Sequence, residues 1–194
     1  MRRRSLLLTL AAALTLAALP AQATILVSVI DVFSTPNDVF TRTFYYDPAT
    51  MGAILNVQTW GYGGSSGAPG GTNLAGFVVP SGGFDPIATL FSGVTVSGSP
   101  VAVNDDGSCP PGTPAPSCYD STLSLTGLSA GNYTLALTAF SNFWTGSAWE
   151  NDGSFSGRTS TYAVDVQAVP EPVTFVLLGS GLLGLGLLRR RSRG

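Results

Sequence analysis

This sequence of 194 residues contains no histidine and no lysine, and only 10% of its residues are charged. It therefore lacks the nucleophile–histidine pairs of hydrolases, the lysine of Schiff-base enzymes and the imidazole ligands of zinc and haem sites. Paired carboxylates alone do serve glycosidases. The carboxylates here lie in turns beside glycines, and we expect no enzymatic activity.

Basic residues are also scarce between the two ends of the chain. From residue 24 to residue 169 there are ten acids but only two arginines, Arg42 and Arg158, which gives a formal charge of −8. A surface of this kind repels phosphates, because the cations that would neutralise them are missing. The composition excludes nucleic-acid binding and is consistent with solubility outside the cell or with binding of divalent cations.

The N-terminus has the features of a targeting sequence. The triplet Arg2-Arg3-Arg4 precedes an apolar run from Leu6 to Leu19, and Ala21-Gln22-Ala23 follows. A charged head, a hydrophobic run of this length and an A-x-A end are typical of a secretory signal peptide. We expect residues 1–23 to be recognised by the Sec translocon and removed after Ala23. The alternative, an N-terminal membrane anchor, is disfavoured by the shortness of the run.

The C-terminus combines three features in order. Pro170, Glu171 and Pro172 precede an uncharged stretch at 173–188, and Arg189, Arg190 and Arg191 follow it. As a transmembrane helix this stretch would reach about 24 Å, less than the ~30 Å of a hydrocarbon core. The arginines would remain in the cytoplasm. The stretch is therefore predicted to anchor the chain in the inner membrane transiently.

This arrangement over residues 169–194 resembles the PEP-CTERM sorting signal of Gram-negative bacteria that make exopolysaccharide. The resemblance implies recognition by an exosortase, a membrane protease-transpeptidase that cuts near Pro170-Glu171-Pro172 and passes the protein outward. An ordinary tail anchor with a chance Pro-Glu-Pro triplet is the alternative. We expect the final location to be the cell surface or the extracellular matrix.

The middle of the chain, residues 24–168, alternates apolar and polar side chains with a period of two, which is typical of half-buried strands. The expected strands are 25–32, 39–46, 54–60, 87–91, 94–96, 101–103, 122–125, 133–139 and 162–166. No segment has helical periodicity. Eight or nine short strands separated by glycine, proline and asparagine predict an all-β ectodomain, an antiparallel sandwich of the jelly-roll kind. The glycine-rich stretch 61–71 is expected to be a loop.

Two cysteines, Cys109 and Cys118, lie in the exported part and are expected to pair in an oxidising compartment. They close a loop of about ten residues, worth roughly 2–3 kcal/mol in the chain-entropy model. A redox-active pair is the alternative, but these cysteines lack the C-x-x-C spacing that lowers a thiol pKa.

Acids gather in sequence on either side of this loop. Asn104, Asp105 and Asp106 precede it, Asp120 follows it, and Asp85 lies upstream at the start of an expected strand. Calcium prefers several oxygen ligands of these types, so these five residues are candidate ligands. The alternative is that Asn104-Asp105-Asp106-Gly107 is a plain hairpin turn, which its Asp-Gly step suits.

Three short motifs carry a second resemblance: Gly83-Phe84-Asp85-Pro86, Asn104-Asp105-Asp106-Gly107, and the stretch 128–133 with the pattern L-x-A-G-x-Y. Together they resemble a family of exported PEP-CTERM proteins that is similar to bacterial pre-peptidase C-terminal domains. The resemblance implies a non-catalytic β-sandwich that can bind calcium.

The stretch 142–157 contains two tryptophans, Trp144 and Trp149. An exposed aromatic loop can stack on a sugar ring, so a carbohydrate-binding module that contacts exopolysaccharide is the alternative function. In the other interpretation the two indoles cap an edge of the core. The leading expectation is an exported, non-catalytic surface or matrix protein.

Overall fold

The computed structural model describes residues 22–62, 70–107 and 119–170. Within these residues the regular secondary structure consists of β-strands and one helical turn, α2 (Pro48–Met51). The strands are β1 (Thr24–Val32), β2 (Phe40–Tyr46), β3 (Ile54–Trp60), β4 (Gly71–Thr72), β5 (Val78–Val79), β6 (Pro86–Ser92), β7 (Ala102–Asn104), β8 (Thr122–Thr126), β9 (Gly131–Ala139) and β10 (Thr161–Val169). Every pair of these strands is antiparallel, which confirms the all-β prediction.

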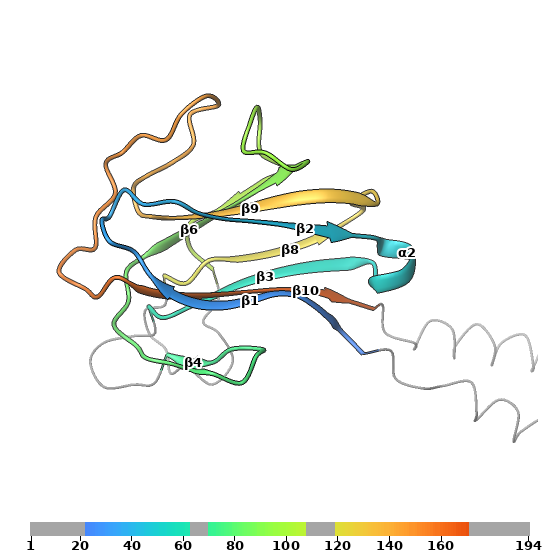
Figure 1. Cartoon of the computed structure of the whole chain (residues 1–194), viewed down its shortest axis with the longest axis horizontal. Coiled ribbons are helices and arrows are strands. Elements are labelled where there is room, and N and C mark those ends of the chain that lie inside the picture. The colour runs from blue at the N-terminus through green and yellow to red at the C-terminus, as the bar shows by residue number, and fades with distance from the viewer. Residues whose placement is uncertain (1–21, 63–69, 108–118, 171–194) are drawn as a thin grey trace, which may run out of the picture. The chain divides into compact units, whose positions relative to one another are not determined.

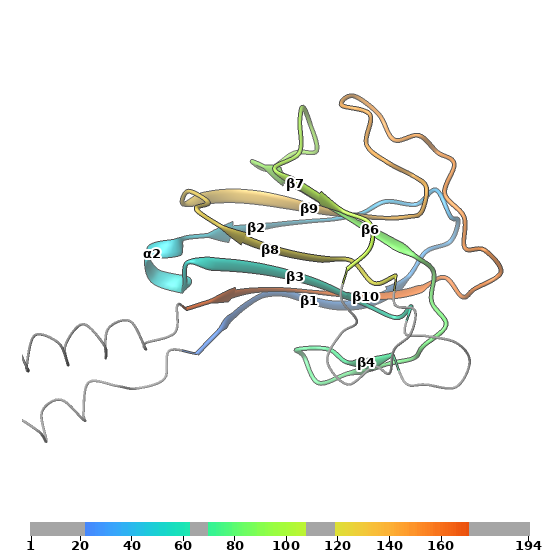
Figure 2. The same ribbon diagram turned by 180° about the vertical axis from the view of Figure 1, so that it is seen from behind.

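Eight of the strands form two four-stranded sheets. One sheet has the order β1-β10-β3-β8, the other has the order β2-β9-β6-β7, and β4 and β5 form a separate two-stranded hairpin. Figures 1 and 2 show the two sheets as two layers, with the β4–β5 hairpin beside the first. Consecutive strands repeatedly change sheet, so residues far apart in the sequence become neighbours.

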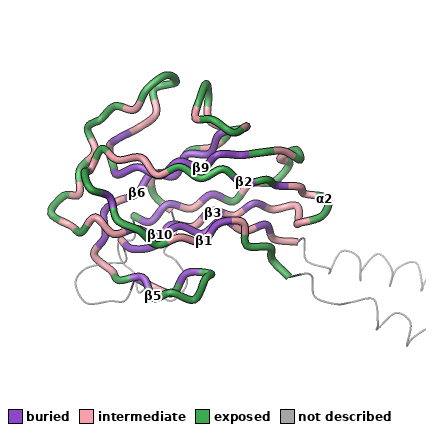
Figure 3. Tube along the Cα trace, in the orientation of Figure 1, coloured by how far each residue is buried: buried purple, intermediate pink, exposed green. Residues whose placement is uncertain are grey.

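The core lies between the two sheets and follows the period-two pattern of the sequence. In β3, Leu55, Val57 and Thr59 are buried, whereas Asn56 and Gln58 between them are only partly covered. Figure 3 shows the same alternation of burial along the strands. One cluster of buried side chains draws on both sheets, so each sheet buries its apolar face against the other.

Aromatic rings close one end of this core. The ring of Tyr162 in β10 lies 4.6 Å from that of Phe33 and 5.6 Å from that of Phe40 in β2, centroid to centroid. Phe84, 2% exposed, stacks on Phe33 at 5.0 Å. These contacts bridge the two sheets, and burial raises the pKa of the Tyr162 hydroxyl.

Most of the expected strands are present, with two differences. The prediction of a strand at 94–96 is wrong, because this stretch belongs to the connection between β6 and β7 and Val94 is 62% exposed. The hairpin of β4 and β5 was not expected. Its strands are two residues each, too short to produce a periodic pattern, and Gly71 of β4 lies at the end of the stretch expected to be a loop.

All the strands belong to one compact unit, Ala23–Val169. Four parts of the expected targeting segments lie outside the described residues: residues 1–21 of the signal peptide, Glu171-Pro172 of the sorting motif, the stretch 173–188 and the terminal arginines. No helix within residues 22–62, 70–107 and 119–170 has the length and apolar character needed to span a bilayer.

Candidate functional site

The expected metal ligands lie at the ends of strands that the fold brings together. Asp85 directly precedes β6, Asp105 and Asp106 follow β7, and Asp120 lies shortly before β8. β6 pairs with β7, with Ala88 opposite Asn104. The start of β6, where Asp85 lies, is therefore next to the end of β7, where Asp105 and Asp106 lie. Asp120 lies in the segment that leads into β8, which belongs to the other sheet.

The hydroxyl of Ser121 joins these segments. It is fully buried and lies 2.5 Å from the carbonyl of Pro86, 2.8 Å from that of Asn104 and 2.7 Å from that of Asp105. A hydroxyl has one proton to donate, so the three carbonyls share it. This contact fixes the segment before β8 against the ends of β6 and β7 and therefore sets the spacing of the acids.

The four carboxylates interact electrostatically. Burial raises the pKa of Asp85 to about 7, and the charges of Asp105, Asp106 and Asp120 add to the rise, while Arg158 opposes it. Burial, and then the charge of Asp106, raises the pKa of Asp105. Oδ1 of Asp85 and Oδ1 of Asp105 are both buried without a hydrogen-bond partner. These two carboxylate oxygens without hydrogen-bond partners lie in one acidic cluster, and they are ligands of the kind that a hard cation requires.

Other members of the expected ligand set are already engaged. Oδ1 of Asn104 accepts a 3.0 Å hydrogen bond from the amide of Thr122. Oδ1 of Asp120 accepts from the hydroxyl of Thr59 at 3.2 Å and from the amide of Tyr62 at 3.4 Å, and Asp120 is fully buried. No three acidic, histidine or cysteine side chains among the described residues are arranged so as to hold a metal ion. The fold brings the acids together, but their side chains do not converge on one point.

Arg158 is the cation nearest this cluster. Its guanidinium lies 3.6 Å from the ring centroid of Tyr62, and it donates hydrogen bonds to the carbonyls of Gly83 and Tyr62. Arg158 therefore ties the end of β3 to the start of β6, and it offsets part of the negative charge.

The stretch Asn104–Gly107 is not a two-residue hairpin turn, because the strands before and after it, β7 and β8, belong to different sheets. Its glycine has a packing role: a Cβ on Gly107 would lie 2.4 Å from Oγ1 of Thr122 and 2.8 Å from the carbonyl of Asp120. The plain-hairpin interpretation of this motif is therefore wrong.

The other two motifs also have structural roles. A Cβ on Gly83 would lie 2.3 Å from the carbonyl of Thr161, and Phe84 fills the aromatic end of the core. The hydroxyl of Tyr133 donates a 2.8 Å hydrogen bond to the carbonyl of Ser129, in the manner of a tyrosine corner. Gly83 and the aromatic positions of both motifs therefore serve packing, whereas a Cβ on Gly131 would meet nothing within 4 Å.

Trp144 and Trp149 lie together at the edge of the second sheet. Their rings are 5.2 Å apart, and the ring of Trp144 meets the buried ring of Phe91 edge-on at 5.6 Å. Nε1 of Trp144 donates a 2.8 Å hydrogen bond to the carbonyl of Gly98. Both side chains are partly buried. This arrangement favours the interpretation that they cap the edge of the core.

Cys109 and Cys118 lie outside the described residues. The residues on either side of the segment 108–118 are held close: the amide of Gly107 donates a 3.0 Å hydrogen bond to the carbonyl of Asp120. These flanks are compatible with the expected pairing of the two cysteines.

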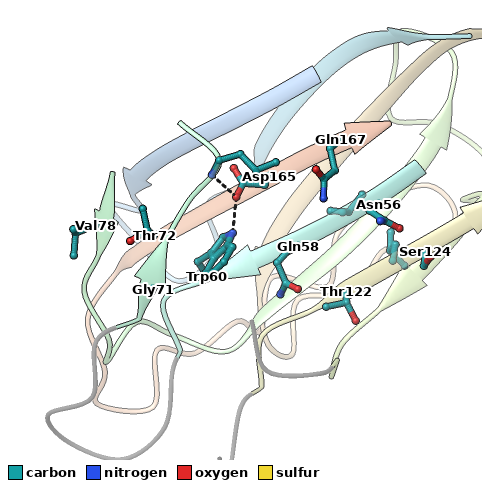
Figure 4. A pocket seen from close by; sticks show the side chains of 13 residues that line it. Asn56, Gln58, Trp60, Gly71, Thr72, Val78, Thr122, Ser124, Asp165 and Gln167 are labelled. Carbon is teal, nitrogen blue, oxygen red and sulfur yellow. Dashed lines mark hydrogen bonds between the residues drawn. The ribbon is translucent and has the colours of Figure 1, made fainter. Parts of the chain in front are cut away.

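A groove that the sequence analysis did not anticipate lies on the outer face of the β1-β10-β3-β8 sheet (Figure 4). Its volume is ≈ 890 Å³, and the β4–β5 hairpin forms one wall. The only signal in the sequence is the polar half of the β3 alternation, Asn56 and Gln58; Gln167 lies beyond the strand expected at 162–166, since β10 extends to Val169.

Comparison with protein-family models, with curated proteins and with solved structures gives no match for this chain.

Proposed function

We propose that this protein is an exported, non-catalytic β-sandwich of an exopolysaccharide-producing Gram-negative bacterium, delivered to the cell surface or matrix by processing at both ends. One observation carries the proposal. The compact unit begins at Ala23, the last residue of the proposed signal peptide, and ends at Val169, the residue before the Pro-Glu-Pro triplet. Cleavage near both points would leave all the described strands intact.

The proposed order of events starts with the Sec translocon and removal of the signal peptide. The C-terminal stretch then anchors the chain in the inner membrane until an exosortase cuts near Pro170-Glu171-Pro172. Since β10 extends to Val169 and is paired on both sides, the fold ends just where the protease would need an extended, accessible chain.

The experiment is the intact mass of the protein recovered from an exosortase-containing host. We expect a mass that lacks both the signal peptide and residues 173–194, and an unprocessed C-terminus in the variant Glu171→Ala. The matched control is Asp152→Ala, which changes an exposed acid of the folded unit. A wild-type mass that still includes residues 173–194 would refute the processing step. Alkylation before and after reduction of the same sample counts the free thiols and so tests the pairing of Cys109 with Cys118.

Within the all-β class, we assign this fold to the jelly rolls. If the β4–β5 hairpin is set aside and the other strands are counted from one to eight, their sheet orders become 1-8-3-6 and 2-7-4-5. This is the order that the two Greek keys of a jelly roll produce. The assignment is consistent with a binding or structural role, since the fold itself supplies no catalytic group.

Calcium at the acidic cluster is the second part of the proposal. The unpaired oxygens of Asp85 and Asp105 are supporting observations, because an added cation would give both a partner and relieve the repulsion among the four carboxylates. Asp106 is exposed, so its side chain is free to rotate toward the other two. Such a rotation is required, because the carboxylates do not converge as they lie.

A further inference from the structure

The groove on the outer face of the β1-β10-β3-β8 sheet is built from rows of polar side chains. Strand register places Ser28, Asp165, Gln58 and Thr122 opposite one another across all four strands. The adjacent row places Gln167, Asn56 and Ser124 opposite one another across three strands. Figure 4 shows the carboxamides and hydroxyls of these rows projecting from β10, β3 and β8 toward the same side.

Most of these groups have no hydrogen-bond partner within the part of the chain that the structure describes. The side chains of Gln167, Ser124 and Thr122 make no hydrogen bond to any described residue, and Oδ1 of Asn56 is buried without a partner. Gln58 uses only its Nε2, which donates to the carbonyl of Thr59 at 2.8 Å. Carboxamides and hydroxyls both donate and accept hydrogen bonds. The rows therefore present several unused donors and acceptors at strand spacing.

The groove carries almost no free charge. Among the described residues that line it, only Asp165 is charged, and it is 2% exposed. Its Oδ1 accepts from the hydroxyl of Ser28 at 2.6 Å, and its Oδ2 accepts from Nε1 of Trp60 and from the amide of Leu74. Because no basic residue is found in the described part of the lining, nothing there would neutralise a phosphate, sulfate or carboxylate.

Apolar groups complete the lining on the side of the hairpin. Leu74 and Val78 are 37% and 71% exposed, and Val78 projects from the wall that β4 and β5 raise beside the sheet. The indole of Trp60, which is 7% exposed, lies at the foot of this wall against Gly71. The groove thus combines hydrogen-bonding groups on its floor with apolar side chains along the hairpin.

From these features we propose that this groove binds a neutral oligosaccharide or polysaccharide chain. The ring hydroxyls of a sugar match the unused carboxamides and hydroxyls of the floor, and its C–H faces match Leu74 and Val78. The acidic surface of the folded unit disfavours a polyanionic chain. This inference goes beyond the proposed export and sorting and does not depend on them, because binding is a property of the folded unit wherever it is delivered.

The test is isothermal titration calorimetry on the full chain in a detergent that has no sugar head group, with chelator present so that calcium cannot bridge to the ligand. The probes are hexasaccharides of β-1,4-glucan, α-1,4-glucan and β-1,4-mannan, with an alginate hexasaccharide as the acidic counterpart. We expect at least one neutral probe to bind and the alginate probe not to bind. The double variant Gln58→Ala/Gln167→Ala should weaken that binding about tenfold, since it removes two ligand hydrogen bonds.

Two further variants locate the site. Thr126→Ala, an exposed residue at the end of β8 on the same face but outside the groove lining, should bind as the wild type does. Trp144→Ala should also bind normally. The proposal is overturned if no neutral probe binds, if alginate binds as well as the neutral probes, or if binding survives the double variant. Binding that is lost only in Trp144→Ala would place the glycan site on the tryptophan loop and would also overturn it. Thermal unfolding of each variant checks that it is folded.

Discussion

Nε1 of Trp60 donates a 2.7 Å hydrogen bond to Oδ2 of Asp165, although the two residues are 105 positions apart in the sequence. The same carboxylate accepts from the amide of Leu74 at 2.9 Å and from the hydroxyl of Ser28 at 2.6 Å. One buried side chain in the middle of a sheet therefore holds the neighbouring strands and the β4–β5 hairpin together. The floor and the wall of the groove are both attached to this carboxylate.

Replacing this carboxylate should destabilise the protein. Asp165→Ala leaves three donors without their acceptor. Hydrogen bonds to charged groups contribute about 1.5–3 kcal/mol each. Because water can reach the outer donors in the variant, we expect the free energy of unfolding to fall by roughly 3 kcal/mol in total. Urea unfolding measures it. The control Asp152→Ala removes an exposed acid and should change the free energy of unfolding by less than about 0.5 kcal/mol. An equal effect of the two variants would mean that Asp165 has no special structural role.

The contact between Gly71 and Trp60 gives a second prediction. A Cβ at Gly71 would lie 2.6 Å from Cε3 and Cζ3 of the indole, and Gly71 has a φ of +141°. Gly71→Ala should therefore displace the hairpin from the sheet and lower the thermal midpoint. Gly76→Ala is the matched control, because Gly76 has a φ of +84° but nothing within 4 Å of its Cβ. If both variants lose the same stability, backbone strain alone explains the effect, and the steric contact is unimportant.

The acidic cluster should make stability depend on pH. The pKa of Asp85 is raised from 3.8 to about 7, chiefly by burial and then by the charges of Asp105, Asp106 and Asp120. Between these two values the folded state binds more protons than the unfolded state, so stability should fall as the pH rises from about 4 to about 7. Because Asp85 is only partly buried, solvent screening limits the fall to a few °C in the thermal midpoint.

Asp85→Asn should flatten this part of the pH profile, measured by thermal unfolding without divalent cations. Asp38→Asn is the control, since hydrogen bonds from the Thr35 hydroxyl and the amides of Thr35 and Ser34 lower the pKa of Asp38. Asp38 therefore contributes stability that is lost only at lower pH. A wild-type profile that rises between pH 5 and pH 7 would contradict the assignment of Asp85.

Calcium should offset the loss of stability that the ionised acids of this cluster cause at pH 7. We expect the thermal midpoint of the unit Ala23–Val169 at pH 7 to rise with calcium but not with magnesium, by an amount that corresponds to about 2.7 kcal/mol when calcium is at 100 times its Kd. Asp85→Ala and Asp106→Ala should abolish the rise, and Asp152→Ala should keep it. Equal midpoints in calcium, magnesium and chelator would leave the four acids as a purely structural feature.

The sequence was sufficient to predict the fold class, because the period-two pattern of strands such as β3 and β9 is strong and uninterrupted. It could not predict the β4–β5 hairpin, whose stability comes from contacts with Trp60 and Asp165 rather than from its own residues. The segment 94–96 has a strand-like composition, yet tertiary context places Val94 in an exposed connection. Local propensity was misleading in both cases because distant residues decide the structure.

The acidic cluster could be predicted from the sequence, whereas the groove could not. The acids were found because Asp85, Asp105, Asp106 and Asp120 are rare charges beside turns, and the fold does gather them. The groove could not be found, because Asn56, Gln58 and Gln167 become a single surface only when β10 inserts between β1 and β3. A residue pattern within one strand carries no information about which strand will lie beside it.

The position of β10 also has a consequence for biogenesis. The last strand of the unit lies inside its sheet, and its partner β1 is the first strand, with Thr24 opposite Ala168. Neither the sheet nor the core that it covers can close until the chain is available as far as residue 169. On the export route proposed above, the chain would cross the membrane almost completely as an incomplete intermediate whose exposed strand edges are open to proteases and need holding chaperones. On that route, folding would be a single late event that follows the completion of export.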